Sequence, residues 1–528
     1  MAPARRSSQN SWPKIFCDAC NKTKSASHEL RPALATNQGK KFTSFRFTML
    51  FVEFRFFWFF LAVFAVYWSL RENRSRKIWL LACSYFFYAC WNWKFLFLIM
   101  ASSALDYFVG AMLARTEDPR KRRGWLIMSL CLNLGTIAFF KYYNFFVTSA
   151  AALLAWLGLP ASLHTLNIVI PVGVSFYTFH SMSYTIDVYR RKLEPVRSLL
   201  DLACFIGFFP QMVAGPIVRA SQFLPQLLSV RRFADVDVRG ALVLFLTGFI
   251  KKACIADAVA PFVDRYFDAP WDFTMPSAWV AVLFYAIQIY CDFSGYTDMA
   301  IATAGLLGYE LPVNFRFPYF AANIADFWHR WHITLSSWLR DYLYIPLGGN
   351  RGPAWFVYRN IMITMLLGGL WHGGAWTFVI WGGLHGLALV VHRAWTSRRD
   401  PLPTAQEMQK HRLPKGPQSL GGWFAWAFTV YWVCFAWIFF RAVDLQHAGP
   451  ALRSFLFLPG AGTENLGAWM LWIVAALGFV HYLNFRGVFA KWWRRPSPLV
   501  FAAGYGCAFA VVLLFIPPHY APFIYFQF

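Results

Sequence analysis

The residue whose type and surroundings best suit catalysis is His372. It lies in the run Gly368-Gly-Leu-Trp-His-Gly-Gly-Ala-Trp376, inside a stretch, 361–384, that contains no charged residue. A neutral imidazole is well suited to transfer protons near neutral pH, and the flanking glycines allow another backbone or a ligand to approach closely. The alternative is a buried histidine that donates to a neighbouring carbonyl, and spacing alone favours neither.

A second polar run covers residues 326–351 and contains His329 and His332. On one helix these two histidines would share a face, which suits a metal pair. Because no third histidine or carboxylate follows at helical spacing, we expect no metal site. In the same part of the chain, Asn314, Asn323 and Asp326 are interpreted as caps and turn residues rather than catalysts.

Basic residues near these runs suggest a second kind of chemistry. They could gather on the cytoplasmic side and hold phosphate groups, because guanidinium and ammonium groups bind phosphate oxygens. The alternative is anchoring at the membrane interface. The residues concerned are Arg330, Arg340, Arg351, Lys251 and Lys252.

Two carboxylates, Asp292 and Asp298, stand in an otherwise apolar run. They are six residues apart and therefore not on one helical face. We expect them to form structural pairs with buried basic residues or to orient a histidine. Further supporting candidates are Asp341, Asn350 and His385.

The elements that must position these residues are membrane helices. Of the 528 residues, 58% are hydrophobic and only 14% are charged, whereas soluble domains carry about 25% charged residues. This composition excludes a soluble enzyme and predicts an all-α polytopic bundle of about 10–12 spans with re-entrant segments. The predicted spans are 50–70, 78–113 as two helices, 125–146, 200–212, 241–260, 278–305, 361–391, 423–440, 468–485 and 500–516.

The net charge of +24 is distributed over short loops beside the apolar runs, including 71–77, 115–123 and 190–192. This distribution is the positive-inside pattern of cytoplasmic loops rather than a nucleic-acid surface. Residues 1–48 are polar and basic and are interpreted as a disordered extension, with translation from Met49 as a hypothesis. Residues 49–528 are expected to form one membrane domain. The segments 168–189, 208–219 and 314–351 are apolar but interrupted by Gly, Pro and charge, so they must be buried or line a cavity.

Several motifs, taken together and in order, resemble the membrane-bound O-acyltransferase family, and most closely its branch that acetylates alginate. They are Pro171-Val-Gly-Val-Ser-Phe-Tyr, Ala214-Gly-Pro216, Asp292-Phe-Ser-Gly-Tyr-Thr-Asp298-Met-Ala, the run from Trp331-His332 to Asn350-Arg351, and Leu370-Trp-His372-Gly. The resemblance covers roughly residues 49–485.

The resemblance implies a helical bundle around a central tunnel, with a funnel reaching in from the cytoplasm. His372 matches the family's hallmark histidine and His332 its second active-site histidine. The implied reaction is transfer of an acetyl group from cytoplasmic acetyl-CoA, with no resident cofactor, to an extracytoplasmic polysaccharide. The implied partners are periplasmic acetyltransferase subunits, and the implied location is the bacterial inner membrane. His372 would act as the base, and His332 would orient or polarise the substrate.

Alternatives remain within and outside this family. An acyl carrier protein could replace CoA, and peptidoglycan, cellulose or teichoic acid could be the acceptor. In another class, His332, His372 and His385 could ligate haem in an electron carrier. Interrupted helices also suit a transporter, although no inverted repeat is present in the sequence.

Overall fold

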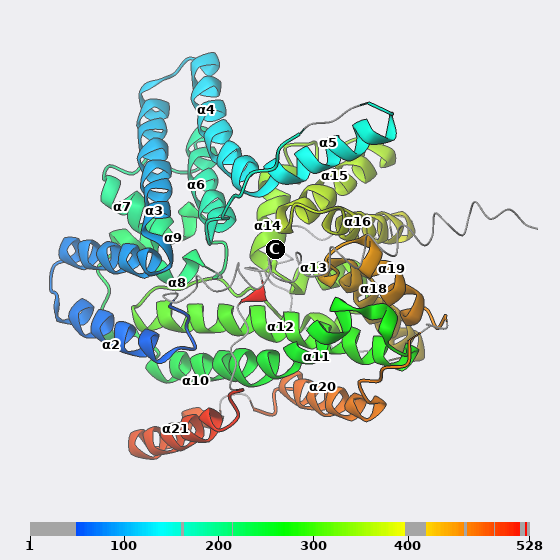
Figure 1. Ribbon diagram of the computed structural model, residues 1–528. Coiled ribbons are helices and arrows are strands. Elements are labelled where there is room, and N and C mark those ends of the chain that lie inside the picture. Colours follow the sequence, from blue (N-terminus) through cyan, green and yellow to red (C-terminus); the bar gives the residue numbers. More distant parts are fainter. Residues whose placement is uncertain are drawn as a thin grey trace, which may run out of the picture. The chain divides into compact units, whose positions relative to one another are not determined.

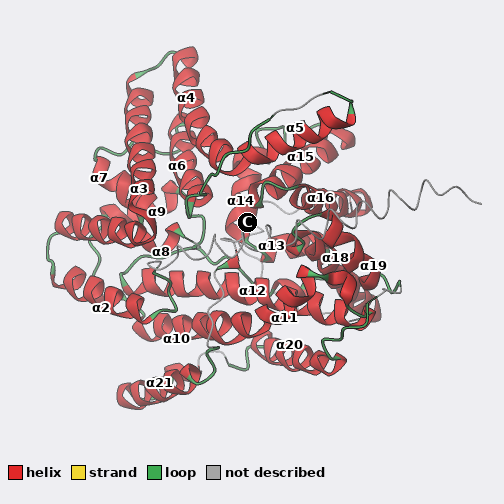
Figure 2. Ribbon diagram, viewed as in Figure 1, coloured by secondary structure: helices red, strands yellow, loops and turns green. Residues whose placement is uncertain are grey.

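The computed structural model describes residues 49–159, 163–213, 215–396, 419–458, 462–489, 492–517 and 523–524. The regular structure of the described residues is helical, and none of these residues forms a β-strand (Figure 2). The predicted all-α class is therefore confirmed. The predicted extension 1–48 lies outside the described residues.

Five helices of the described part are long and apolar enough to cross a membrane. An α-helix needs about 20 residues to cross the roughly 30 Å of hydrocarbon. The five candidate spans are Asn73–Arg115, Pro119–Trp156, Met275–Leu306, Leu420–Arg441 and Ala468–Phe485. Two shorter apolar helices, Phe54–Ser69 and Pro498–Leu513, accompany them. The chain is thus a multi-pass membrane protein.

The first group of helices contains the predicted pair over 78–113. Helical structure extends from Asn73 to Arg115, but Asn92 has extended backbone angles (φ −162°, ψ 106°) and divides α3 into two helices, as expected. The group consists of α2 (Phe54–Ser69), α3 (Asn73–Arg115), α4 (Pro119–Ile137), the π-helical η1 (Ala138–Tyr142) and α5 (Tyr143–Trp156).

The predicted span 200–212 is wrong. Nine-residue α7 covers about 14 Å at 1.5 Å per residue, too little to cross a bilayer, and Phe208 separates it from a four-residue helix. Both are buried inside the bundle. This second group consists of α6 (Val174–Tyr189), α7 (Leu199–Gly207), α8 (Phe209–Met212), α9 (Ala220–Leu228) and the short η2 (Phe233–Asp235).

The centre of the bundle is α12, the most deeply buried of the candidate spans. It contains the predicted span 278–305, and α10 and α11 pack along it (Figure 1). The group consists of α10 (Val238–Phe249), the π-helical η3 (Ile250–Ala256), α11 (Asp257–Asp268), η4 (Pro270–Asp272) and α12 (Met275–Leu306).

The predicted span 361–391 is two helices, α15 and α16, which pack against each other after a break that begins at Gly373. Short helices precede them, as expected for an interrupted segment. The group consists of η5 (Pro318–Phe320), α13 (Ile324–Arg330), α14 (Ile333–Leu339), the π-helical η6 (Arg340–Tyr344), α15 (Ala354–His372) and α16 (Trp376–Thr396).

Of the last helices, α18 packs into this core and α20 and α21 lie on its outside. Figure 1 shows α20 and α21 beside α10 and α11, and neither α20 nor α21 contains a buried residue. The group consists of α18 (Leu420–Arg441), α19 (Leu445–Phe455), η7 (Ala468–Met470), α20 (Leu471–Phe485), η8 (Trp492–Arg494) and α21 (Pro498–Leu513).

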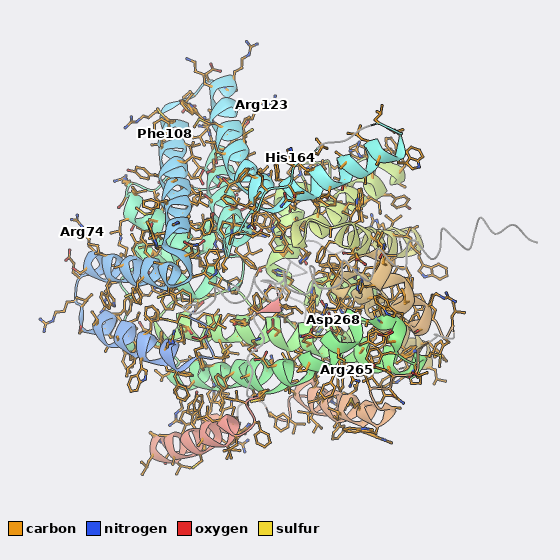
Figure 3. All side chains as sticks on the ribbon, viewed as in Figure 1. Arg74, Phe108, Arg123, His164, Arg265 and Asp268 are labelled. Carbon is orange, nitrogen blue, oxygen red and sulfur yellow. The ribbon has the colours of Figure 1, made fainter. Side chains whose placement is uncertain are left out.

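Exposed basic residues lie at helix ends, where the sequence placed cytoplasmic loops. Figure 3 labels two of them, Arg74 in the first turn of α3 and Arg123 in the first turns of α4. Arg76 and Arg122 are instead buried and hold loops together: Arg76 donates to the Arg231 carbonyl (2.7 Å) and Arg122 to the Tyr189 carbonyl (3.0 Å). The loop charges thus serve both as interface anchors and as clamps between helices.

Candidate active site

His372 is the last residue of α15, rather than lying deep within a helix. Its side chain is 2% exposed. Aromatic rings surround the imidazole, with centroid distances of 4.9 Å to Trp371, 5.0 Å to Trp381 and 5.1 Å to Phe440. The imidazole of His372 therefore lies at the C-terminal end of α15 and is enclosed by aromatic rings.

The glycines around His372 permit close backbone contacts, as the sequence suggested. A Cβ on Gly369 would collide with the Phe378 carbonyl, and one on Gly382 would collide with the Met365 carbonyl, so α15 and α16 cross at backbone contact. A Cβ on Gly374 would lie 2.8 Å from the Lys141 carbonyl. These glycines therefore allow α16 and the chain at Lys141 to approach the end of α15 that carries His372.

Lys141 is a supporting residue that the sequence reasoning missed. Its Nζ donates to the Trp371 carbonyl at 2.5 Å and lies 5.8 Å from the centre of the Trp371 ring. An ammonium group at a helix C-terminus satisfies a carbonyl that has no partner within the helix and complements the helix dipole. No local signal could have revealed it, because Lys141 is 230 residues away in the chain.

His332 stands at a break in the chain. Its backbone is left-handed (φ 43°, ψ 53°), and it separates α13 from α14. A left-handed conformation costs a non-glycine residue about 1–3 kcal/mol, and such strain clusters at functional sites. The side chain is fully buried.

Asn314 determines which nitrogen of His332 carries the proton. Asn314 Oδ1 accepts hydrogen bonds from the Thr334 backbone N–H (3.2 Å) and hydroxyl (2.9 Å), and it lies 3.1 Å from His332 Nδ1. Since this oxygen can only accept, the neutral imidazole must carry its proton on Nδ1. His332 Nε2 then has a lone pair, and it has no hydrogen-bond partner among the described residues. It is therefore able to accept a hydrogen bond or a proton from a substrate.

The two histidines meet at one indole. The Trp371 ring lies 4.9 Å from His372 and 6.1 Å from His332, measured between ring centroids. His385 is fully buried on α16 and contacts Trp381, which also contacts His372. Neither nitrogen of His385 has a partner among the described residues. The structure thus joins His332 to His372 through the Trp371 ring and His385 to His372 through the Trp381 ring.

Asp292 and Asp298 pair with lysines. Lys252 Nζ lies 2.6 Å from Asp292 Oδ1 and 2.7 Å from Asp257 Oδ1, and these three side chains are at most 3% exposed. Lys251 lies 2.7 Å from Asp298. The interpretation of Asp292 and Asp298 as structural pairs fits this geometry, and the structure joins neither to a histidine by a hydrogen bond.

The predicted phosphate cluster is not formed by the residues expected. Lys251 and Lys252 are engaged by carboxylates of the core, and Arg330 is 4% exposed and pairs with Asp326 at 2.8 Å. The ion pairs neutralise these three cations. Lys251, Lys252 and Arg330 therefore do not form the phosphate cluster that was one of the two alternatives for them.

A different set of arginines does converge, and we call it the arginine cluster: Arg190, Arg219 and Arg340. Arg219 and Arg340 lie 2.6 Å and 2.7 Å from the Asp341 carboxylate. Arg190 donates to the Asp341 carbonyl at 3.1 Å, and the Arg190 and Arg219 guanidinium groups lie 5.5 Å and 5.9 Å from the centre of the Tyr342 ring. The Arg219 and Arg340 side chains are 22% and 28% exposed, so a ligand can reach them.

Asn350 and Arg351 lie in an exposed turn before α15. Asn350 accepts a hydrogen bond from the Tyr344 hydroxyl at 2.6 Å. The whole of α15, about 27 Å at 1.5 Å per residue, separates this turn from His372. The structure therefore does not bring these two residues to the histidine pair.

His329 and His332 do not share a helical face. The helix ends at Arg330, and the left-handed backbone of His332 turns its side chain into the core while His329 stays exposed. In the described part of the chain, no group of three or more His, Cys, Asp or Glu residues is arranged to hold a metal.

Replacing Asn314 with alanine is expected to lower kcat/KM by about tenfold, because a hydrogen bond to His332 Nδ1 is lost and its tautomer is no longer fixed. The pH profile of kcat should change as well. Asn323→Ala is the matched control, since Asn323 caps α13 by accepting from the Asp326 N–H at 2.8 Å and does not touch His332. An unchanged pH profile in Asn314→Ala would contradict the role assigned to Asn314.

The model of the MBOAT, membrane-bound O-acyltransferase family, matches residues 125–435. The peptidoglycan O-acetyltransferase of Helicobacter pylori is 39% identical over 421 residues, 74% of this chain and 75% of that protein. The probable alginate O-acetylase AlgI of Azotobacter vinelandii is 40% identical over 408 residues, 76% of each chain. The teichoic acid D-alanyltransferase of Bacillus subtilis is 26% identical over 53% of this chain and 71% of its own length.

The match to the family model includes His332, His372 and the tryptophans that contact them. Because that match covers more than half of the chain, and relatives near 40% identity cover about three quarters of it, the chain belongs to the membrane-bound O-acyltransferase family and is an O-acyltransferase.

Proposed function

We propose that this enzyme transfers an acetyl group from cytoplasmic acetyl-CoA to a hydroxyl of an extracytoplasmic polysaccharide, with His372 as general base. The observation that carries the proposal is the pair of buried imidazoles at the Trp371 ring, one of which has a lone pair on Nε2. Two proton acceptors in an apolar enclosure suit acyl transfer, which requires a hydroxyl to lose its proton as it attacks.

In the proposed reaction, a hydroxyl next to the reacting one on the acceptor donates a hydrogen bond to His332 Nε2, which orients the acceptor. The oxygen of the reacting hydroxyl attacks the thioester carbonyl carbon and its proton passes to His372, giving a tetrahedral oxyanion. The oxyanion collapses, the carbon–sulfur bond breaks, and the leaving thiolate takes the proton from His372. An ester and a free thiol are the products, so atoms and charge balance.

The arginine cluster supports a donor with phosphate groups. Asp341 follows His332 by nine positions along α14 and η6, about 14 Å at the rise of a helix. A donor that places its phosphates at the cluster and its thioester at the histidines needs a long, thin arm between the two, which is the form of phosphopantetheine. CoA and an acyl carrier protein share this arm, and CoA is the donor we propose.

The acceptor is proposed from the names of the relatives, and the partners from what the motif resemblance implies. Two of them are named for O-acetylation of alginate and of peptidoglycan, and one for alanylation of teichoic acid. An alginate-like polysaccharide is the acceptor we propose, reached with periplasmic acetyltransferase subunits from the bacterial inner membrane. Peptidoglycan, teichoic acid and cellulose are the alternative acceptors.

The donor is tested by Arg219→Gln, assayed as acetyl transfer from labelled acetyl-CoA by membranes that contain the partner subunits. We expect KM for acetyl-CoA to rise about tenfold with kcat nearly unchanged, because a charge-assisted contact to phosphate is lost. Arg265→Gln is the control, since Arg265 forms an exposed pair with Glu464 (2.8 Å) outside the cluster.

Two outcomes would contradict the donor assignment. Equal KM values for acetyl-CoA in Arg219→Gln and Arg265→Gln would show that the arginine cluster does not bind the donor. Transfer from an acetylated carrier protein, with none from acetyl-CoA, would replace CoA by the carrier while leaving the histidine chemistry intact.

A further inference from the structure

A cavity of about 1170 Å³ lies between α10, α12, α18, α20 and α21. It is larger than the roughly 300–1,000 Å³ of ordinary small-molecule sites. Neither His332 nor His372 lines it, and the lining residue Tyr290 reaches His332 only through the Phe315 ring, with centroid distances of 6.0 Å and 6.3 Å. The cavity is therefore separate from the acyl-transfer site.

The lining of this cavity is almost entirely aliphatic and aromatic, as in Leu246, Leu283 and Leu477. Protein interiors are close-packed, and a large apolar void loses the dispersion contacts of every atom around it. Two of its walls, α20 and α21, have no buried residue and therefore face the surrounding membrane. The hydrocarbon chains of membrane lipids are therefore the groups available to occupy the cavity.

The polar groups of the lining point to more than a hydrocarbon chain. Lys251 is neutralised by Asp298 at 2.7 Å. His481 Nε2, in contrast, is buried and has no hydrogen-bond partner among the described residues. An unsatisfied buried nitrogen is costly unless a ligand pairs with it. His481 is four residues before the end of α20, about 6 Å inside that end.

The rim at this end of α20 is aromatic and basic. Trp423, Trp426, Trp492 and Trp493 line the cavity there, and tryptophan is enriched where membrane meets water. Arg239 donates to the Pro496 carbonyl at 2.9 Å, and its guanidinium lies 5.1 Å from the centre of the Phe501 ring.

The rim therefore carries a net positive charge. Arg494 and Arg495 are exposed, and Arg239 donates to the backbone carbonyls on either side of Arg495, while Asp237 pairs with Arg494 at 2.8 Å. Basic pockets between membrane helices bind anionic lipid headgroups.

We propose that this cavity binds one anionic glycerophospholipid. Its acyl chains fill the apolar space, an ester carbonyl near the glycerol pairs with His481, and its phosphate lies at the rim arginines among the tryptophans. The order of these groups along α20, apolar wall, His481 and then the basic rim, matches the order of chain, ester and phosphate in the lipid. This site is independent of the proposed acetyl transfer.

The first test fills the cavity. Gly478 on α20 and Gly504 on α21 both line it, and a Cβ on either meets no atom within 4 Å, so phenylalanine there enters the cavity rather than the protein. Native mass spectrometry of the purified full chain is expected to find one phospholipid retained by the wild type. Gly504→Phe and Gly478→Phe should retain about tenfold less.

Gly506→Phe is the matched control. Gly506 is on the same helix as Gly504 and also has open space around it, but it does not line the cavity. This variant should keep the lipid. Equal retention by Gly504→Phe and Gly506→Phe, or a wild type that holds only detergent or a non-phospholipid, would overturn the proposal.

The second test addresses the headgroup. Delipidated protein is exposed to detergent micelles containing phosphatidylglycerol or phosphatidylethanolamine, and we expect the anionic lipid to be preferred. Arg239→Gln and Arg495→Gln should each reduce this preference by about fivefold, because each cation near a membrane surface contributes attraction of that size. Equal binding of the two lipids by the wild type would contradict the proposal that the site selects an anionic headgroup.

Discussion

Replacing His372 with alanine is expected to lower acetyl transfer by about 10²- to 10⁴-fold, the usual contribution of a general base. The imidazole lies at the end of α15 in an enclosure of aromatic rings, which cannot accept a proton in its place. The measurement is the rate of label transfer from acetyl-CoA at matched protein levels.

His329→Gln is the control for this loss, because His329 is exposed and only three residues from His332. It should transfer acetyl groups at nearly the wild-type rate. Partial recovery of His372→Ala by added imidazole would show that a base, rather than the fold, was removed. A rate for His372→Ala within a few-fold of the wild type would contradict the assigned base.

Replacing Lys252 with methionine is expected to destabilise the protein by about 3–5 kcal/mol, because it leaves two buried carboxylates without a counter-charge. Lys252 lies between Asp257 and Asp292, and Asp292 also accepts from the Ile524 backbone N–H at 2.9 Å. The ion pairs therefore join η3, α11 and α12, and the hydrogen bond adds the segment at Ile524. Thermal unfolding of the detergent-solubilised protein measures the loss.

Two further variants define the cause. Arg265→Gln removes an exposed pair, whose side chains are 61% and 48% exposed, and should cost at most about 1 kcal/mol. The triple variant Lys252→Met, Asp257→Asn and Asp292→Asn removes the buried charges together and should recover much of the stability. A triple variant no more stable than Lys252→Met would show that the unpaired carboxylate charges do not cause the loss of stability.

The sequence by itself determined the class of the protein. An apolar composition and long hydrophobic runs specify membrane helices, because backbone groups in lipid must be paired and a helix pairs them within one continuous apolar run. The same local patterns predicted the division of α3 and the position of α12. The motifs around His332 and His372 led to the family, since each motif is a contiguous run whose residue types can be read without knowing which helices meet.

Other features depended on contacts that no local pattern encodes. The break at His332 depends on Asn314, which accepts from the first turn of α14 across 20 residues. Lys141 reaches Trp371 across 230 residues. His329 and His332 do not share a helical face, although their spacing had predicted one, because the contacts with Asn314 interrupt the helix between them.

The arginines illustrate the same division. Their charge was evident, but Arg330 turned inward to Asp326, whereas Arg219 from the segment before α9 met Arg340 at Asp341. Charge and hydropathy are properties of single residues and short runs, and they determine which segments enter the membrane. Which side chains pair is decided by the packing of helices that are distant in the chain, and only the tertiary structure supplies that information.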